Sequence, residues 1–149
     1  MPLCGTGNTL GQLTASPTSL SFENVTTGSS TTLAEKLTNT GGSVLTISQI
    51  TPSGAGFGFS GITLPLTLAA AQSVSVTFNA SFAPQTAASV TGSLVISSNA
   101  SNPTLSLAST GTGTLPSTLA VAPTTLNFGN VTVGTTQNQT AHSVRAAPL

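Results

Sequence analysis

The stretch LTASPTSLSFENVTTG, residues 13–28, returns as LAVAPTTLNFGNVTVG, residues 119–134. Self-similarity at a fixed offset, here 106 residues from position 13 to position 119, is typical of a tandem array. A period of about 100 residues favours β-sandwich modules, because solenoid repeats are only about 20 to 50 residues long. The identical positions in the first copy are Leu13, Pro17, Thr18, Leu20, Phe22, Asn24, Val25, Thr26 and Gly28.

The repeat also predicts where modules begin and end. Gly5-Thr-Gly7 and Gly111-Thr-Gly113 are related by the same offset, and no helical pattern follows either copy, so we interpret both as linkers and not as phosphate-binding turns. We expect 1–12 to end a preceding module, 13–113 to form a complete module and 114–118 to be a linker. Residues 119–149 would then be the truncated start of a following module, ending in a tail, QTAHSVRAAPL, that departs from the repeat.

Inside the complete module, apolar residues alternate with Thr and Ser in several short runs. Such alternation is typical of half-buried strands, and segments rich in Gly, Pro and Asn separate the runs. The pattern predicts an all-β fold, an antiparallel β-sandwich of about seven strands. The alternating residues are Leu20 and Phe22; Leu45 and Ile47; Val74, Val76, Phe78, Ala80 and Phe82; Leu94 and Ile96; and Leu105 and Leu107.

Five segments resemble, in order and spacing, the ASPM, SPD-2, Hydin-type domain. They are SPTSLSFENVTTGSS, KLTNTGGSVLTISQI, LTLAAAQSVSVTF, Phe82-Ala-Pro84 and SLVISSNASNPTLSLASTGTG. The resemblance implies an immunoglobulin-like sandwich related to major sperm protein and to the PapD chaperone domain. It brings no catalytic residues. Eukaryotic members sit on centrosomes and cilia, and bacterial ones look like repeated modules of large secreted or surface proteins, whose Thr, Ser and Gly bias is similar to this one.

Composition excludes several partners. The 149 residues include two basic residues, two acidic residues and one His, giving a net charge of zero. Nucleic acid is not expected as a partner, because phosphate contacts need clustered Lys and Arg. No apolar run reaches the roughly 20 residues of a membrane-spanning helix, and no signal-peptide pattern opens the sequence. With the resemblance, this favours an extracellular or cell-surface location as part of a larger secreted protein, without membrane insertion.

The sequence contains few residues that could act in catalysis. His142 and Ser143 are neighbours and would point to opposite faces of a strand, and the chain has no Asp to orient a triad. A zinc site needs three or four clustered ligands, and Cys4 is the single cysteine, interpreted as a loop thiol. We predict no catalytic residues, no metal site and no cofactor. A small serine hydrolase is the least favoured alternative.

Glu35 breaks the alternation of its run. It stands between Leu33 and Leu37, at a position that would face inward. Burying a lone carboxylate is unfavourable unless it is paired or protonated. We therefore expect a bulge or an edge position that turns Glu35 to solvent beside Lys36. The alternative is an inward charge that discourages pairing at a sheet edge.

The absence of catalytic groups favours a structural or interaction module. The alternative is a carbohydrate-binding or protein-binding module, for which Phe57 and Phe59, in the Gly-rich segment GAGFGFSG, are the candidate ligand-facing aromatics.

The incomplete second copy has an apolar face that needs a partner. It could add to the edge of its own module or to the sheet of another copy, and self-association is the favoured outcome. Its candidate interface residues are Leu119, Val121, Leu126, Phe128, Val131 and Val133.

Overall fold

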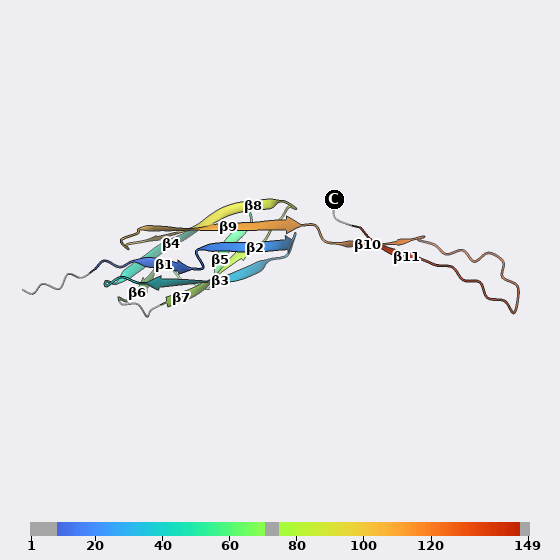
Figure 1. Cartoon of the computed structure of the whole chain (residues 1–149), viewed down its shortest axis with the longest axis horizontal. Helices are drawn as coiled ribbons and strands as arrows, with labels where there is room; N and C mark the ends of the chain where they lie inside the picture. The colour runs from blue at the N-terminus through green and yellow to red at the C-terminus, as the bar shows by residue number, and fades with distance from the viewer. Residues whose placement is uncertain (1–8, 71–74, 147–149) are drawn as a thin grey trace, which may run out of the picture. The chain divides into compact units, whose positions relative to one another are not determined.

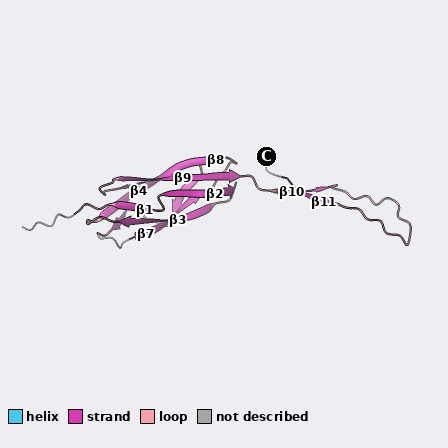
Figure 2. Ribbon diagram, in the orientation of Figure 1, coloured by secondary structure: helices cyan, strands magenta, loops and turns pink. Residues whose placement is uncertain are grey.

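The structure, a computed structural model, describes residues 9–70 and 75–146, so Cys4, Gly5-Thr-Gly7 and Val74 lie outside the described residues. Within these ranges every regular element is a β-strand (Figure 2), and none is a helix able to cross a membrane. The chain divides into two compact units, Met1–Thr114 and Leu115–Leu149. The strands are β1 (Leu13–Ser16), β2 (Ser19–Thr26), β3 (Thr31–Asn39), β4 (Leu45–Ser53), β5 (Phe57–Ser60), β6 (Leu66–Leu68), β7 (Ser75–Phe82), β8 (Ser89–Ser98), β9 (Thr104–Thr114), β10 (Thr118–Ala122) and β11 (His142–Ala146).

The first unit is a sandwich of two sheets (Figure 1). One sheet has the order β1-β3-β7-β5 and the other the order β2-β9-β8-β4-β6. Alternate residues of the strands face inward and form one core, so the predicted all-β sandwich is confirmed. The described residues of the first unit form nine strands instead of about seven, because the chain changes sheets between β1 and β2 and because the short β5 and β6 pair with β7 and β4, respectively.

The opening of the module contributes to both sheets. β1 pairs antiparallel with β3, whereas β2 pairs with β9 in parallel, an exception to the antiparallel pattern expected from the sequence. The Asn102 side chain fixes the start of β1: its Oδ1 accepts from the Leu13 amide at 3.0 Å, and its Nδ2 donates to the Leu13 carbonyl at 2.7 Å. The first residue of β1 is therefore held next to the start of β9.

Three aromatic rings occupy the middle of the core. Phe57 and Phe82 stack with ring centroids 4.8 Å apart, and Phe22 lies 5.7 Å from each of them. The three residues come from β2, β5 and β7, so this cluster joins the two sheets.

The second Gly-Thr-Gly is not a linker, and the expectation that it is one is wrong. Gly111 and Gly113 are inward-facing residues of β9. A Cβ on Gly111 would lie 2.6 Å from the Phe82 ring, and one on Gly113 would lie 2.1 Å from the Thr86 carbonyl oxygen. These glycines are needed for close packing inside a strand.

Glu35 faces the core, and the expectation that it turns to solvent is wrong. It has no exposed surface, lies opposite Phe78 in the β3–β7 pair, and neither carboxylate oxygen makes a hydrogen bond. Burial raises the pKa of Glu35 from 4.5 to about 7, an increase that the nearby Ser16 backbone reduces only in part. The pleat of β3 explains the orientation, because residue 35 must share the face of the buried Leu37.

The described part of the second unit, up to residue 146, contains one pair of strands. β10 pairs antiparallel with β11, from Thr118 opposite Ala146 to Ala122 opposite His142. The tail that departs from the repeat therefore supplies the partner of the repeated first strand. Two backbone features of the first unit also recur here at the offset of 106: a positive φ at Glu23 and Gly129 (54° and 57°) and at Gly28 and Gly134 (81° and 89°).

Candidate functional site

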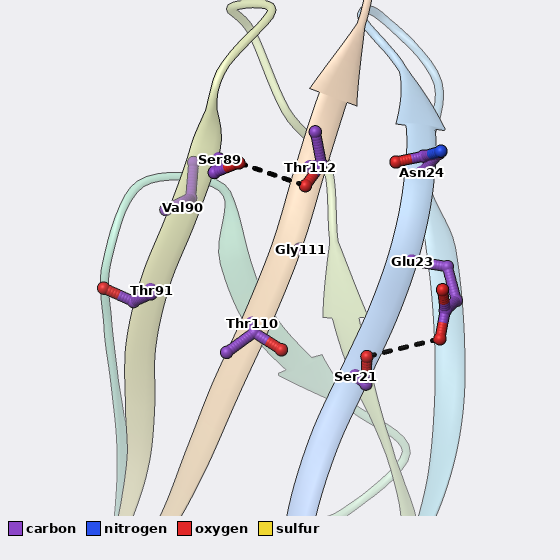
Figure 3. A pocket seen from close by; sticks show the side chains of 9 residues that line it. All are labelled: Ser21, Glu23, Asn24, Ser89, Val90, Thr91, Thr110, Gly111 and Thr112. Carbon is purple, nitrogen blue, oxygen red and sulfur yellow. Dashed lines mark hydrogen bonds between the residues drawn. The ribbon is translucent and has the colours of Figure 1, made fainter.

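A polar groove lies on the outer face of the five-stranded sheet, across β2, β9 and β8 (Figure 3). It encloses about 270 Å³. Most of its side chains carry hydroxyl groups because the polar residues of the alternating strands face outward here. The lining residues are Ser21, Glu23, Asn24, Ser89, Val90, Thr91, Thr110, Gly111 and Thr112.

An irregularity in β2 shapes one wall of the groove. The register with β9 shifts between Ser21 and Asn24, and Glu23, within this bulge, has a φ of 54°. A non-glycine residue rarely adopts this left-handed conformation, and bulges commonly redirect a side chain. Glu23 is therefore held in an unfavourable backbone conformation, and its carboxylate lies on the groove wall (Figure 3).

The groove offers hydrogen bonds and a single charge. Glu23 Oε1 accepts from the Ser21 hydroxyl at 3.4 Å, and a 3.3 Å hydrogen bond joins the hydroxyls of Ser89 and Thr112. Glu23 is the one charged residue among those that line the groove. Hydroxyls, an amide and a carboxylate can bind a neutral ligand rich in hydroxyl groups, but they are poorly suited to an anion.

Replacing Glu23 with glycine should raise the free energy of unfolding by about 1 kcal/mol, because glycine adopts positive φ without the steric penalty of a Cβ. Gly129 already occupies the equivalent position of the repeat. Urea denaturation measures the change, and Glu23→Gln, which removes the charge and keeps the Cβ, is the control. Equal stability of the two variants would contradict a backbone origin of the gain.

The groove was not predictable from the alternation of residues, because it forms only where β2 pairs with β9, far from it in the sequence. One signal was present: the repeat has Gly129 where the first copy has Glu23. A glutamate at a position where the repeat uses glycine indicates a backbone conformation that glycine favours.

Phe57 and Phe59 do not form an exposed pair. Phe57 is buried in the aromatic cluster, and Phe59 is half-buried with its ring edge-to-face on Phe78, at a centroid distance of 6.4 Å. Both rings are used in core packing, so this segment offers no flat aromatic surface to a sugar.

The six candidate interface residues are all exposed, and four of them repeat buried core residues of the module. They lie on β10 and in the segment that follows it, and each exposes more than two fifths of its surface. The six residues lie within one segment of 15 residues, 119–133, and no contact in the structure tests their predicted role as an interface. The exposed fractions are 73% for Leu119, 47% for Val121, 43% for Leu126, 42% for Phe128, 44% for Val131 and 101% for Val133.

The other candidate groups belong to different units of the chain. His142 is exposed at the start of β11, in the second unit, whereas both glutamates belong to the first unit. Among residues 9–70 and 75–146, no three His, Cys, Asp or Glu side chains lie close enough to hold a metal ion.

Comparison with known proteins identifies the family. The family described as HYDIN/CFA65/VesB-like, Ig-like domain matches residues 11–112, more than half of the chain. This chain belongs to the HYDIN/CFA65/VesB-like Ig-like family. The resemblance inferred from the five sequence segments is thereby confirmed, and the sandwich is immunoglobulin-like. A search of curated proteins gave no match.

Solved structures are similar to this HYDIN/CFA65/VesB-like domain at low sequence identity, two of them with a TM-score of 0.50. The secreted serine protease VesC from Vibrio cholerae matches with a TM-score of 0.50 and 15% identity, over 64% of this chain and 22% of VesC. The PapD-like domain 7 of human CEP192 matches with a TM-score of 0.50 and 12% identity, over 78% of this chain and 93% of that domain. The Vibrio cholerae protease VesB matches with a TM-score of 0.43 and 17% identity, over 68% of this chain and 31% of VesB. The chain thus spans about a fifth of the length of VesC, in which this fold is one part of a larger protein.

Proposed function

We propose that the chain is a non-catalytic structural and interaction module of a repetitive extracellular or cell-surface protein, which associates with itself through residues 119–134. One observation carries the proposal. A segment that repeats the opening of the module leaves six large apolar side chains exposed, and contiguous exposed apolar residues mark interaction sites. The low charge of the chain adds little electrostatic repulsion between copies.

Two further observations support the remaining parts of the proposal. Membership of an Ig-like family supports a scaffolding role without catalysis. A structural relative, VesC, is a secreted protein, which supports an extracellular role for this domain. The match covers less than a quarter of the length of VesC, as expected if the domain is a module attached to other parts.

Self-association predicts a mass that depends on concentration. Multi-angle light scattering after size exclusion should give a weight-average mass that rises above the 14.6 kDa of one chain as the concentration increases. Phe128→Asp should reduce this rise, because a charge on the apolar segment opposes its burial. Ala120→Asp introduces the same charge on β10 at a position outside the six apolar residues, and it should have the smaller effect. A mass of one chain at every concentration would overturn the proposal.

The groove favours a second candidate function, the binding of a saccharide or another ligand rich in hydroxyl groups. The observation behind it is the unfavourable backbone of Glu23, because such conformations are concentrated at functional sites. A glycan array should then show binding that Glu23→Gly abolishes while stability increases. Silence of the wild-type chain on the array would remove this candidate.

A further inference from the structure

The segment 119–134 repeats the core residues of β1 and β2. Four residues of the module's opening are at most 7% exposed, and each has an identical residue 106 positions later that is at least 42% exposed. The same side chains thus exist twice, once buried and once exposed. The pairs are Leu13 and Leu119, Leu20 and Leu126, Phe22 and Phe128, and Val25 and Val131.

The backbone of the segment agrees with this equivalence. Gly129 and Gly134 have positive φ, as do Glu23 and Gly28 in the bulge and at the end of β2. The only large difference between the copies within the bulge, Glu23 against Gly129, makes the second copy easier to fit, because glycine favours that conformation. Sequence and backbone therefore both allow 119–134 to occupy the position of β1 and β2 in a sandwich of this type.

Chain length prevents the segment from occupying that position in its own module. Leu13 is bound by Asn102, just before β9 begins, and β9 then runs from Thr104 to Thr114, roughly 33 Å at 3.3 Å per residue. Five residue steps separate Thr114 from Leu119, and they reach about 18 Å when fully extended. Leu119 therefore cannot return to the position of Leu13 in the same chain. A second copy has no such restriction.

We propose that residues 119–134 replace β1 and β2 in the sandwich of a second copy of this chain. Leu119 then takes the position of Leu13 opposite Asn39, and Leu126, Phe128 and Val131 enter the core where Leu20, Phe22 and Val25 lie in the structure. This inference rests on the proposed self-association and specifies its partner surface and its register. Any array formed in this way grows head to tail, because donor and acceptor surfaces are different parts of each chain.

The module's own β1 and β2 compete with the donated segment. They are tethered to their site, which gives them an effective concentration of about a millimolar. Exchange is therefore a minor event in the wild-type chain at low concentration, and it increases when the resident strands are weakened.

Weakening the resident strands tests the proposal. Phe22→Asp places a charge in the aromatic cluster and should release β2, so the variant should associate at least ten times more tightly than the wild-type chain in light scattering. Phe22→Asp combined with Phe128→Asp opens the same acceptor site but spoils the donor segment, and the double variant should not associate in this way. Equal masses for the single and double variants would overturn the proposal.

A second measurement covers the case in which Phe22→Asp does not fold alone. A synthetic peptide of residues 117–136 should then restore cooperative thermal unfolding to the variant, and the same peptide with Phe128→Asp should not. If the peptide does not restore cooperative thermal unfolding, the replacement of β1 and β2 by the donated segment is contradicted. If the wild-type chain still associates through Phe128 in that case, the proposed function stands and only the site of docking is refuted.

Discussion

Replacing Glu35 with glutamine should raise the free energy of unfolding at pH 8 by about 3 kcal/mol. Burial raises the pKa of Glu35 from 4.5 to about 7, and each unit of pKa difference between the folded and unfolded states is worth about 1.4 kcal/mol. The folded protein holds this proton more tightly than the unfolded chain, so its stability should be greatest below pH 4.5, fall between pH 4.5 and 7, and stay low above pH 7. Glutamine keeps the size of the protonated side chain without the charge.

The measurement is urea denaturation at pH 5 and pH 8 for the wild-type chain and the variant. Glu35→Gln should be much more stable than the wild-type chain at pH 8 and only slightly so at pH 5. Glu23→Gln removes an exposed carboxylate and should not reproduce the gain. A loss of stability at pH 8 in Glu35→Gln would show that the carboxylate has a stabilising partner in solution.

Replacing Phe82 with alanine should lower the free energy of unfolding by about 4 kcal/mol. Phe82 has no exposed surface and contacts rings from both sheets, Phe22 at 5.7 Å and Phe57 at 4.8 Å between centroids. The Phe82 ring also fills the space above Gly111, where a Cβ would lie 2.6 Å away. Removal of the ring leaves a cavity where the two sheets meet, and large-to-small changes at such sites are among the most destabilising.

Phe59→Ala provides the matched comparison, because it removes the same ring from a half-buried position of the same sheet. Urea denaturation of both variants at one pH should show a loss of about 2 kcal/mol for Phe59→Ala, roughly half of the loss at Phe82. An equal or greater loss at Phe59 would mean that the core is not centred on the aromatic cluster.

The fold was predictable from the sequence because buried and exposed residues alternate along most of its strands. Residues two apart point to the same side only in an extended strand, whose other face is then exposed to solvent. Examples are Leu20 with Phe22 and Leu94 with Ile96. The parallel pairing of β2 with β9 was not predictable from alternation, because alternation identifies a buried face and not the neighbouring strand. Gly111 was misread for a related reason, since only the position of Phe82 shows why glycine is required there.

The candidate sites were predictable to different extents. The apolar segment was predictable because it repeats the opening of the module and keeps its apolar residues, a comparison that needs the sequence alone. The groove depends on three strands that meet only in the folded sheet, and the inward orientation of Glu35 depends on the pleat that Leu37 imposes. The general expectation that charged side chains face water fails at Glu35, because the buried Leu37 fixes which face of β3 points inward.

Disulfide trapping in solution tests the central claim most directly. In the first unit Thr14 lies opposite Thr38, so Ala120, 106 residues after Thr14, should lie opposite Thr38 of a second copy. Thr38→Cys with Ala120→Cys, in a chain that also carries Cys4→Ser and Phe22→Asp, should give covalent dimers and higher species on a non-reducing gel. Lys36→Cys with Ala120→Cys places the thiols on the same face two residues out of register, beyond the roughly 7 Å between Cα atoms that a disulfide spans, and should not. Equal cross-linking of both pairs, or of neither, would contradict the replacement of β1 and β2 by residues 119–134.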